Sequence, residues 1–283
     1  MRELDERIER ALRARAVRYT PRAGGYSTAD RFAVELDDGR SVFVKSATAP
    51  NLAAWLRREH EVYAALAGPF LPRLEGFDDD GERVVLVLED LSDADWSVRW
   101  DDARVAAVCD ALAAIGASVP PPNTPRARDA HPDLWQRWDA VAAEPGPFLS
   151  LGLRDAAWLD RALPHILAAV TDATGEGGAL CHLDVRSDNM CFRDGAAVLV
   201  DWNWCCLGDP RLDAVAWAPS VAVEGGPPPW EIVPEAGDLV ALVSGVWAAV
   251  AGLPPPETAP TVRDLQRRQL AVALEWLDRE LLR

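Results

Sequence analysis

The chain has almost no lysine: Lys45 is the only lysine among its 29 lysine and arginine side chains. This excludes the phosphate-binding loop G-x-x-x-x-G-K-[ST], because that motif needs a lysine directly after a glycine, whereas Lys45 follows Val44. The sequence also lacks G-x-G-x-x-G, so a dinucleotide-binding fold has no support, and it contains neither G-x-S-x-G nor H-E-x-x-H. Several common nucleotide-binding and hydrolase motifs are therefore absent.

Cysteine pairs and membrane segments are also missing. The five cysteines are odd in number and form no C-x-x-C pair, which argues against a disulfide framework and a structural zinc site. The first ten residues are charged and lack an apolar core, so we expect no secretory signal and a cytoplasmic protein. The longest uncharged stretch starts at Leu239 and meets prolines at Pro254. As a helix, residues 239–253 would span about 22 Å, too short for a bilayer core of about 30 Å. We therefore expect no membrane partner.

The chain has fewer basic than acidic side chains. The net charge is −16, and most of it lies in residues 91–283. We expect no nucleic-acid partner, because such a protein presents a basic surface. The acidic field of residues 91–283 suits a cationic ligand, although solubility alone explains it as well.

Hydrophobic periodicity predicts an α+β protein in two parts. Residues 1–90 are expected to form an N-terminal lobe with a small antiparallel sheet, and residues 91–283 a mainly helical C-terminal lobe. The expected strands are 17–19, 32–36, 41–45, 74–77 and 83–88, with a β-rich patch at 190–201. The expected helices are 3–16, 52–66, 102–117, 134–142, 154–173, 235–251 and 261–282.

Lys45 ends a strand-like run, and a compact ammonium on a flexible stem suits a phosphate contact in a narrow cleft. Such a lysine needs a carboxylate partner, whose attraction at contact distance is about 4 kcal/mol before desolvation is subtracted. Glu59 and Glu61 of the following helix both qualify by spacing. They lie on different faces of that helix, so at least one of them is an ordinary surface charge.

The segment from His182 to Asn189 reads H-L-D-V-R-S-D-N and gathers polar groups suited to phosphoryl transfer. Asp184 can orient a hydroxyl and accept its proton. Asn189 and Asp201, which ends an apolar strand, can both offer oxygen ligands to a hard cation such as Mg²⁺. His182 is expected to hold the loop by hydrogen bonds rather than to act as a base.

Taken in order, these pieces resemble the aminoglycoside phosphotransferase family, whose members share the protein-kinase-like fold. The catalytic loop of that family reads H-G-D-x-x-x-x-N, and a metal segment of the type I-D-W-E and the motif G-D-P-x-x-D follow it. The matching segments here are 182–184 with Asn189, then 200–203, then 208–213. Lys45, Glu59 and the hinge-like segment 86–91 extend the match over about residues 20–220. Each motif alone is weak evidence for this resemblance, but the occurrence of all of them in the family's order is specific.

The resemblance implies a two-lobed kinase that transfers the γ-phosphoryl group of ATP or GTP to an alcohol, with Mg²⁺ as cofactor. Lys45 would hold the nucleotide phosphates, with Glu59 as its anchor, and Asp184 would be the catalytic base. Asn189 and Asp201 would bind Mg²⁺. The other implied site residues are Gly25 and Ser27 in the loop near the phosphates, Glu89 and Leu91 at the nucleotide base, and His182 and Asp213, which would support the catalytic loop.

The sequence departs from the family pattern at three places. Leu183 replaces the usual glycine, Asn203 replaces a common acidic residue, and the loop at residues 24–28 lacks an asparagine often found there. These departures concern the loop backbone and the surroundings of the metal, but they remove no essential group.

The small-molecule acceptor and the oligomeric state stay open. A polycationic aminoglycoside fits the acidic second part, while choline-like, sugar and homoserine-like alcohols are alternatives. A catalytically silent nucleotide-binding regulator is a further alternative, although such proteins usually lack the base or a metal ligand. A protein kinase is disfavoured because H-R-D, D-F-G and A-P-E are absent. Candidate contacts to a cationic substrate are Asp133, Asp139, Glu231, Glu235 and Asp238. Three tryptophans either line a substrate pocket or fill the core: Trp202, Trp204 and Trp230.

Overall fold

The computed structural model describes residues 2–22, 29–173, 177–257 and 259–282. The chain groups into two compact units. The first unit contains Met1–Ser97, Ser118–Asn123 and Ser187–Cys205, and the second contains Val98–Ala117, Thr124–Arg186 and Cys206–Arg283. Both units are made of several stretches of chain, and the division into lobes at residue 90 stays a prediction.

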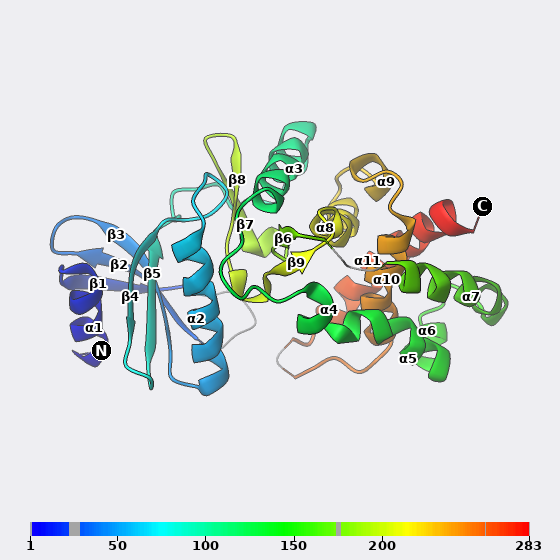
Figure 1. The fold of residues 1–283 in the computed structure, drawn as a ribbon, viewed down its shortest axis with the longest axis horizontal. Coiled ribbons are helices and arrows are strands. Elements are labelled where there is room, and N and C mark those ends of the chain that lie inside the picture. Colours follow the sequence, from blue (N-terminus) through cyan, green and yellow to red (C-terminus); the bar gives the residue numbers. More distant parts are fainter. Residues whose placement is uncertain (1, 23–28, 174–176, 258, 283) are drawn as a thin grey trace. The chain divides into compact units, whose positions relative to one another are not determined.

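A five-stranded antiparallel sheet with the strand order β1-β2-β3-β5-β4 forms the centre of the first unit. Its strands are β1 (Ala16–Pro21), β2 (Asp30–Leu36), β3 (Ser41–Ala47), β4 (Leu74–Asp79) and β5 (Val84–Glu89). Helix α1 (Arg2–Leu12) and helix α2 (Pro50–Ala65) lie on opposite faces of this sheet (Figure 1). The predicted small antiparallel sheet in the N-terminal part is therefore confirmed.

Strand alternation decides which side chains each helix covers. Val42 and Val44 of β3 pack with Leu4 and Ile8 of α1 in one apolar cluster. Because successive strand residues point to opposite faces, Lys45 is directed to the face that α2 covers. The sheet therefore hides its only lysine under a helix that carries carboxylates.

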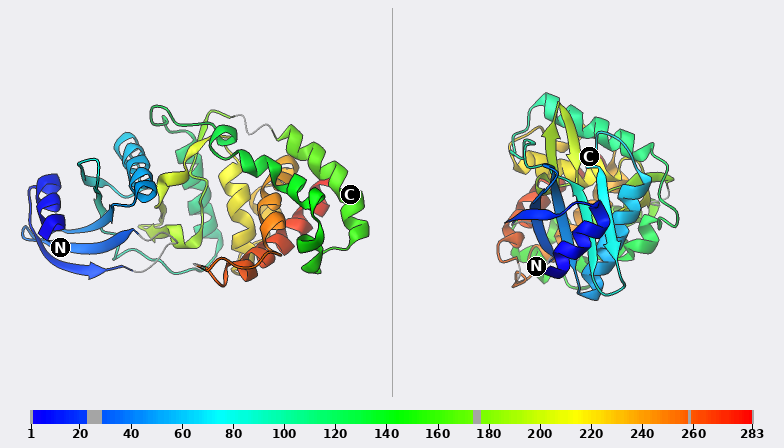
Figure 2. Two further views of the ribbon diagram at one scale, coloured as in Figure 1. Left: turned by 90° about the horizontal axis from the view of Figure 1, so that it is seen from below. Right: turned by 90° about the vertical axis from the view of Figure 1, so that its left-hand side faces the viewer.

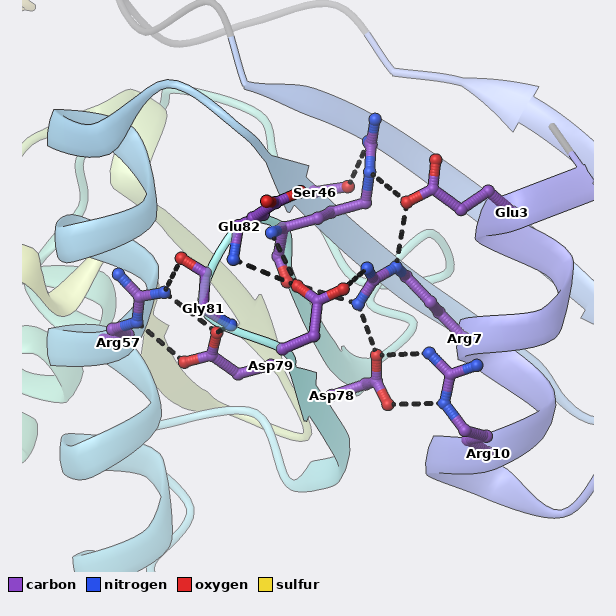
Figure 3. Close-up of polar contacts among 11 residues, drawn as sticks. Glu3, Arg7, Arg10, Ser46, Arg57, Asp78, Asp79, Gly81 and Glu82 are labelled. Atoms are coloured by element: carbon purple, nitrogen blue, oxygen red, sulfur yellow. Dashed lines mark hydrogen bonds and ion pairs between the residues drawn. The ribbon is translucent and has the colours of Figure 1, made fainter.

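The end of β4 and the turn after it tie both helices to the sheet (Figure 3). The buried guanidinium of Arg7, from α1, is ion-paired with Asp78 at 2.8 Å and with Asp80. Arg57, from α2, donates two hydrogen bonds of 2.7 and 2.8 Å to Asp79, and these bonds lower the pKa of that carboxyl. The acidic residues at the end of β4 and in the turn after it thus fix α1 and α2 against the same strands.

A β-hairpin completes the first unit. Strands β7 (Met190–Arg193) and β8 (Ala196–Leu199) are joined by Asp194 and Gly195, whose positive φ angles of 52° and 80° suit a two-residue type I′ turn. Short 3-10 helices, η2 (Ser187–Asn189) and η3 (Trp202–Trp204), flank the hairpin. The predicted β-rich patch at residues 190–201 corresponds to this hairpin and the residues after it.

The second unit is mainly helical, as predicted for the C-terminal part. Helix α10 packs against α5, α7, α8 and α11, and α8, α10 and α11 run side by side (Figure 2). The elements of this unit are α3 (Asp102–Gly116), α4 (Ala127–Ala130), η1 (Pro132–Gln136), α5 (Arg137–Ala143), α6 (Gly146–Ser150), α7 (Ala156–Asp172), β6 (Ala179–Cys181), β9 (Cys206–Gly208), α8 (Leu212–Val223), α9 (Pro229–Ile232), α10 (Gly237–Val250) and α11 (Val262–Leu281). No helix of the described residues is both long and apolar enough to cross a membrane.

Some elements differ from the sequence-based expectation. Helix α8 was not predicted, because it is buried over most of its surface, has no polar stripe and contains Pro219. Helix α1 ends at Leu12 rather than near residue 16, because Arg13 adopts a left-handed backbone with a φ of 56°. Helix α10 begins at Gly237 rather than 235 for the same reason, since Glu235 has a φ of 55°.

Candidate functional site

Lys45 is the centre of a buried charge cluster in the first unit. Its ammonium donates a hydrogen bond of 2.7 Å to Oε2 of Glu59 and a second one to Oδ1 of Asp201. The Lys45 and Glu59 side chains are only 4 and 5% exposed, whereas that of Asp201 is 25% exposed. Burial alone would lower the pKa of Lys45, but the two carboxylates outweigh it and raise the pKa, so the ammonium stays charged.

The structure separates the two candidate partners of Lys45. Glu59 lies on the buried face of α2, together with Leu56 and Val62. Glu61 is exposed and pairs with Arg58 at 3.0 Å on the same helix. Glu59 is therefore the carboxylate in contact with Lys45, and Glu61 is a surface charge.

Asn189 and Asp201 lie at the same end of the β7–β8 hairpin. Asn189 directly precedes β7, and Met190 is paired with Leu199, two residues before Asp201. The Val200 backbone N–H donates a hydrogen bond of 2.9 Å to the Asn189 carbonyl, which holds the two segments together. An amide oxygen and a carboxylate oxygen are donors that suit Mg²⁺, which usually keeps further positions for phosphate oxygens and water. The donor set at this end of the hairpin therefore fits the metal.

Asp184 lies in the second unit, in a loop held by Asp213. The buried Asp213 carboxylate accepts hydrogen bonds from the backbone N–H groups of His182 at 2.6 Å and Leu183 at 2.7 Å. Nδ1 of the fully buried His182 accepts a hydrogen bond of 3.2 Å from the Asp184 N–H. Burial raises the pKa of Asp213, against the effect of its two N–H donors. These contacts are the ones that the predicted loop-supporting roles of His182 and Asp213 require.

A cation next to Asp184 was not anticipated. A guanidinium nitrogen of Arg186 lies 3.4 Å from Oδ1 of Asp184, and the two side chains are 32 and 25% exposed. The signal in the sequence was the position of Arg186, two residues after the candidate base. The sequence analysis assigned no role to Arg186.

The hinge-like segment, residues 86–91, comprises the end of β5 and the two residues after it. The Glu89 carboxylate pairs with Arg193 at 2.7 Å and with Arg73 at 3.4 Å, so its charge is already neutralised. The carbonyl of Leu91 accepts a hydrogen bond of 2.9 Å from the indole N–H of Trp96. Side chains thus fix this stretch of backbone. Two other predicted residues, Gly25 and Ser27, lie outside the described part of the chain.

Comparison with models of known protein families shows which family the chain belongs to. The family model described as "Phosphotransferase enzyme family" matches residues 18–253. The chain belongs to this phosphotransferase family. It is therefore a small-molecule phosphotransferase that acts on a hydroxyl group, and the resemblance stated from the sequence is confirmed. No curated protein matches the sequence.

Solved structures of phosphotransferases share the fold. A thermostable mutant of aminoglycoside phosphotransferase APH(4)-Ia superimposes with a TM-score of 0.57 and 17% identity, covering 97% of this chain and 98% of that one. Spectinomycin phosphotransferase APH(9)-Ia, in complex with ADP and spectinomycin, gives 0.61 and 10%, with coverages of 99 and 98%. A choline/ethanolamine kinase family protein from Mesorhizobium loti gives 0.57 and 15%, with coverages of 90 and 92%. The predicted α+β, protein-kinase-like fold class is thereby confirmed.

One departure of this phosphotransferase from the family pattern has a structural explanation. Leu183, at the usual glycine position, has a φ of 62°, which glycine adopts freely and leucine rarely. The two hydrogen bonds of the loop backbone to Asp213 hold this conformation. The loop thus keeps the left-handed backbone that glycine would adopt easily, at the expense of local strain.

The tryptophans and acidic residues considered for substrate binding have diverse surroundings. Trp202 is fully buried and its indole N–H donates to the Leu199 carbonyl, so it belongs to the core. Trp204 is 44% exposed, and the Trp230 ring is covered by the guanidinium of Arg279 at 4.0 Å. Of the acidic candidates, Asp133 pairs with Arg137, Asp238 lies 3.8 Å from Arg211, and Asp139, Glu231 and Glu235 are exposed.

Proposed function

We propose that this phosphotransferase transfers the γ-phosphoryl group of ATP or GTP to a hydroxyl of an aminoglycoside-like or other small alcohol, with Mg²⁺ as cofactor. The observation that carries the proposal is the buried Lys45, which is held between Glu59 and Asp201. A lone ammonium sealed between two carboxylates, in a chain that otherwise uses arginine, is difficult to explain by stability alone. It is well explained as a preorganised contact for nucleotide phosphates.

Each residue of the cluster has a distinct proposed role. Lys45 binds the α- and β-phosphates, and Glu59 keeps its ammonium in place. Asn189 and Asp201 hold Mg²⁺, which, when bound, neutralises charge that develops on phosphate oxygens. Glu89 and Leu91 present backbone groups to the nucleotide base, and the contacts from Arg193 and Trp96 restrict their movement.

Asp184 orients the acceptor hydroxyl and accepts its proton. In-line transfer needs little covalent help, so the position of this carboxylate matters more than its strength as a base. Asp213 and His182 fix the loop backbone on both sides of Leu183. This arrangement supports a role in which the carboxylate is held still while the phosphoryl group moves.

An aminoglycoside-like acceptor is the substrate class that we favour. The similar solved structures include a spectinomycin phosphotransferase in complex with ADP and spectinomycin. They also include an amicoumacin kinase in complex with AMP-PNP, Ca²⁺ and Ami. The acidic character of residues 91–283 suits a polycation. Choline-like, sugar or homoserine-like alcohols form the second candidate class, which the choline/ethanolamine kinase among the similar folds supports.

The deciding experiment measures nucleoside-diphosphate release with Mg²⁺ and either ATP or GTP, over a panel of aminoglycosides, amino alcohols and sugar alcohols. Release that one acceptor stimulates, and that Asp184→Ala reduces by orders of magnitude without loss of nucleotide binding, would support the proposal. Stimulation retained in Asp184→Ala would refute the role of Asp184. Mg²⁺-dependent nucleotide binding without turnover on any alcohol would favour a catalytically silent regulator.

A further inference from the structure

The backbone carbonyl of Leu91, in the segment proposed to meet the nucleotide base, is closed by two donors. The N–H of Ala94 donates a hydrogen bond of 3.1 Å to it, and the indole N–H of Trp96 donates one of 2.9 Å. A carbonyl oxygen has two lone pairs, so both of its acceptor positions are occupied. The N–H of the same residue differs, because it makes no hydrogen bond among the described residues. Leu91 therefore offers a ligand one donor and no acceptor.

Trp96 is held on this carbonyl by the backbone around it. Asp95, the residue before it, exchanges two backbone hydrogen bonds of 2.9 Å with Phe192 of β7. Leu91 is itself buried against the same hairpin, in an apolar cluster with Cys191. The Trp96 side chain is 41% exposed, so water could satisfy its N–H without this contact. The fixed ends of the loop, and not burial of the ring, thus keep the indole on the carbonyl.

The two purine bases differ in what they place next to an open N–H. Adenine can accept at N1 with its 6-amine turned towards the Glu89 backbone, and the apolar C2–H then faces the Leu91 carbonyl. Guanine can accept at O6, and its N1–H donor then faces that carbonyl. A donor that leaves water for an occupied acceptor loses a hydrogen bond without replacement. The closed carbonyl therefore disfavours guanine and leaves adenine unaffected.

We propose that the indole of Trp96, by closing the Leu91 carbonyl, makes this phosphotransferase select ATP over GTP. This inference rests on the proposed function, in which Leu91 contacts the nucleotide base. Trp96 acts through the carbonyl, so it is a positioning residue that determines specificity. Removal of its N–H returns one lone pair of the carbonyl to a ligand, while the bond from Ala94 stays in place.

The test is Trp96→Phe, which keeps an aromatic ring and removes the donor. Trp135→Phe is the matched control, because the indole N–H of Trp135 also donates to a backbone carbonyl, that of Ala173 at 2.7 Å, in the second unit. For the wild type and both variants, calorimetry with Mg²⁺ measures the Kd of AMP-PNP and of GMP-PNP. Displacement of AMP-PNP by ATP and by ITP adds a third base, which has the O6 and N1–H of guanine without its 2-amine.

We expect the wild type to bind AMP-PNP at least about tenfold more tightly than GMP-PNP, with ITP as weak as the guanine nucleotide. Trp96→Phe should reduce this ratio by about threefold to tenfold, the range that one hydrogen bond supplies, mainly through tighter binding of GMP-PNP. Trp135→Phe should leave the ratio unchanged.

Two results would overturn the selectivity and leave the proposed function standing: equal affinities of the wild type for AMP-PNP and GMP-PNP, or an unchanged ratio in Trp96→Phe. Displacement by ITP as strong as by ATP would also overturn it, because the 2-amine of guanine would then be the group that is rejected. A wild type that binds neither nucleotide would refute the proposed function, and the selectivity would fail with it.

Discussion

Replacing Lys45 with methionine should produce a loss of stability that grows with pH. The change removes the ammonium and keeps most of the volume, which leaves the carboxylate of Glu59 buried and uncompensated. The group then avoids its charge by binding a proton. Protonating a carboxyl with an ordinary pKa of about 4.3 costs at most about 3.7 kcal/mol at pH 7, and about 1.6 kcal/mol at pH 5.5.

The direction of this pH dependence follows from the linkage between proton binding and folding. In Lys45→Met the folded pKa of Glu59 is raised above its unfolded value, so stability is lost as pH rises from about 4.3 towards the folded pKa. Urea unfolding followed by tryptophan fluorescence between pH 5.5 and 8 measures the difference from the wild type. The double variant with Glu59→Gln should lose the pH slope, because it has no group left to protonate at position 59. A difference that is constant over this range, or a slope retained in the double variant, would refute the reasoning.

Three further outcomes follow from the structure. Arg7→Gln should destabilise the protein by about 1.5–3 kcal/mol in urea unfolding, since it breaks charged hydrogen bonds of a buried guanidinium to the β4–β5 turn; a loss as small as that of the exposed Arg10→Gln would contradict this. Leu183→Gly should be more stable than Leu183→Ala by about 1 kcal/mol, because only glycine is free of strain at a φ of 62°; equal unfolding midpoints would show that the left-handed backbone is not strained. Asp213→Asn should lower kcat and change the nucleotide KM much less. The reason is that an amide has one oxygen to accept the two hydrogen bonds that the carboxylate accepts from backbone N–H groups. Unchanged steady-state kinetics would contradict a supporting role for Asp213.

The sequence predicted the elements of the sheet because their signals are local. Strands β3 and β5 are apolar runs rich in valine, and a turn containing Gly39 precedes β3. Helix α8 lacked such a signal, because a helix buried on nearly all sides has no alternation between polar and apolar residues. The short pairing of β6 with β9 was also missed. Their three-residue segments lie far apart in sequence, and only tertiary contact turns them into strands.

Within the candidate site, the type of each residue helped more than its spacing in the sequence to find the charge cluster around Lys45. Lys45 stood out because lysine is scarce, and its structural partners are two of the carboxylates that the sequence had singled out. Spacing alone could not choose between Glu59 and Glu61, because either face of a helix can be turned to a sheet. The choice depends on which residues of α2 are buried, and Leu52, Leu56 and Val62 share the face of Glu59.

Arg186 escaped detection for a different physical reason. It belongs to no motif that the sequence analysis used, and it gains its significance only from a neighbour that folding provides. Its guanidinium lies 3.4 Å from Oδ1 of Asp184. Motifs identify the groups that do chemistry, whereas the charges that lie beside those groups become visible only through the contacts of the folded chain.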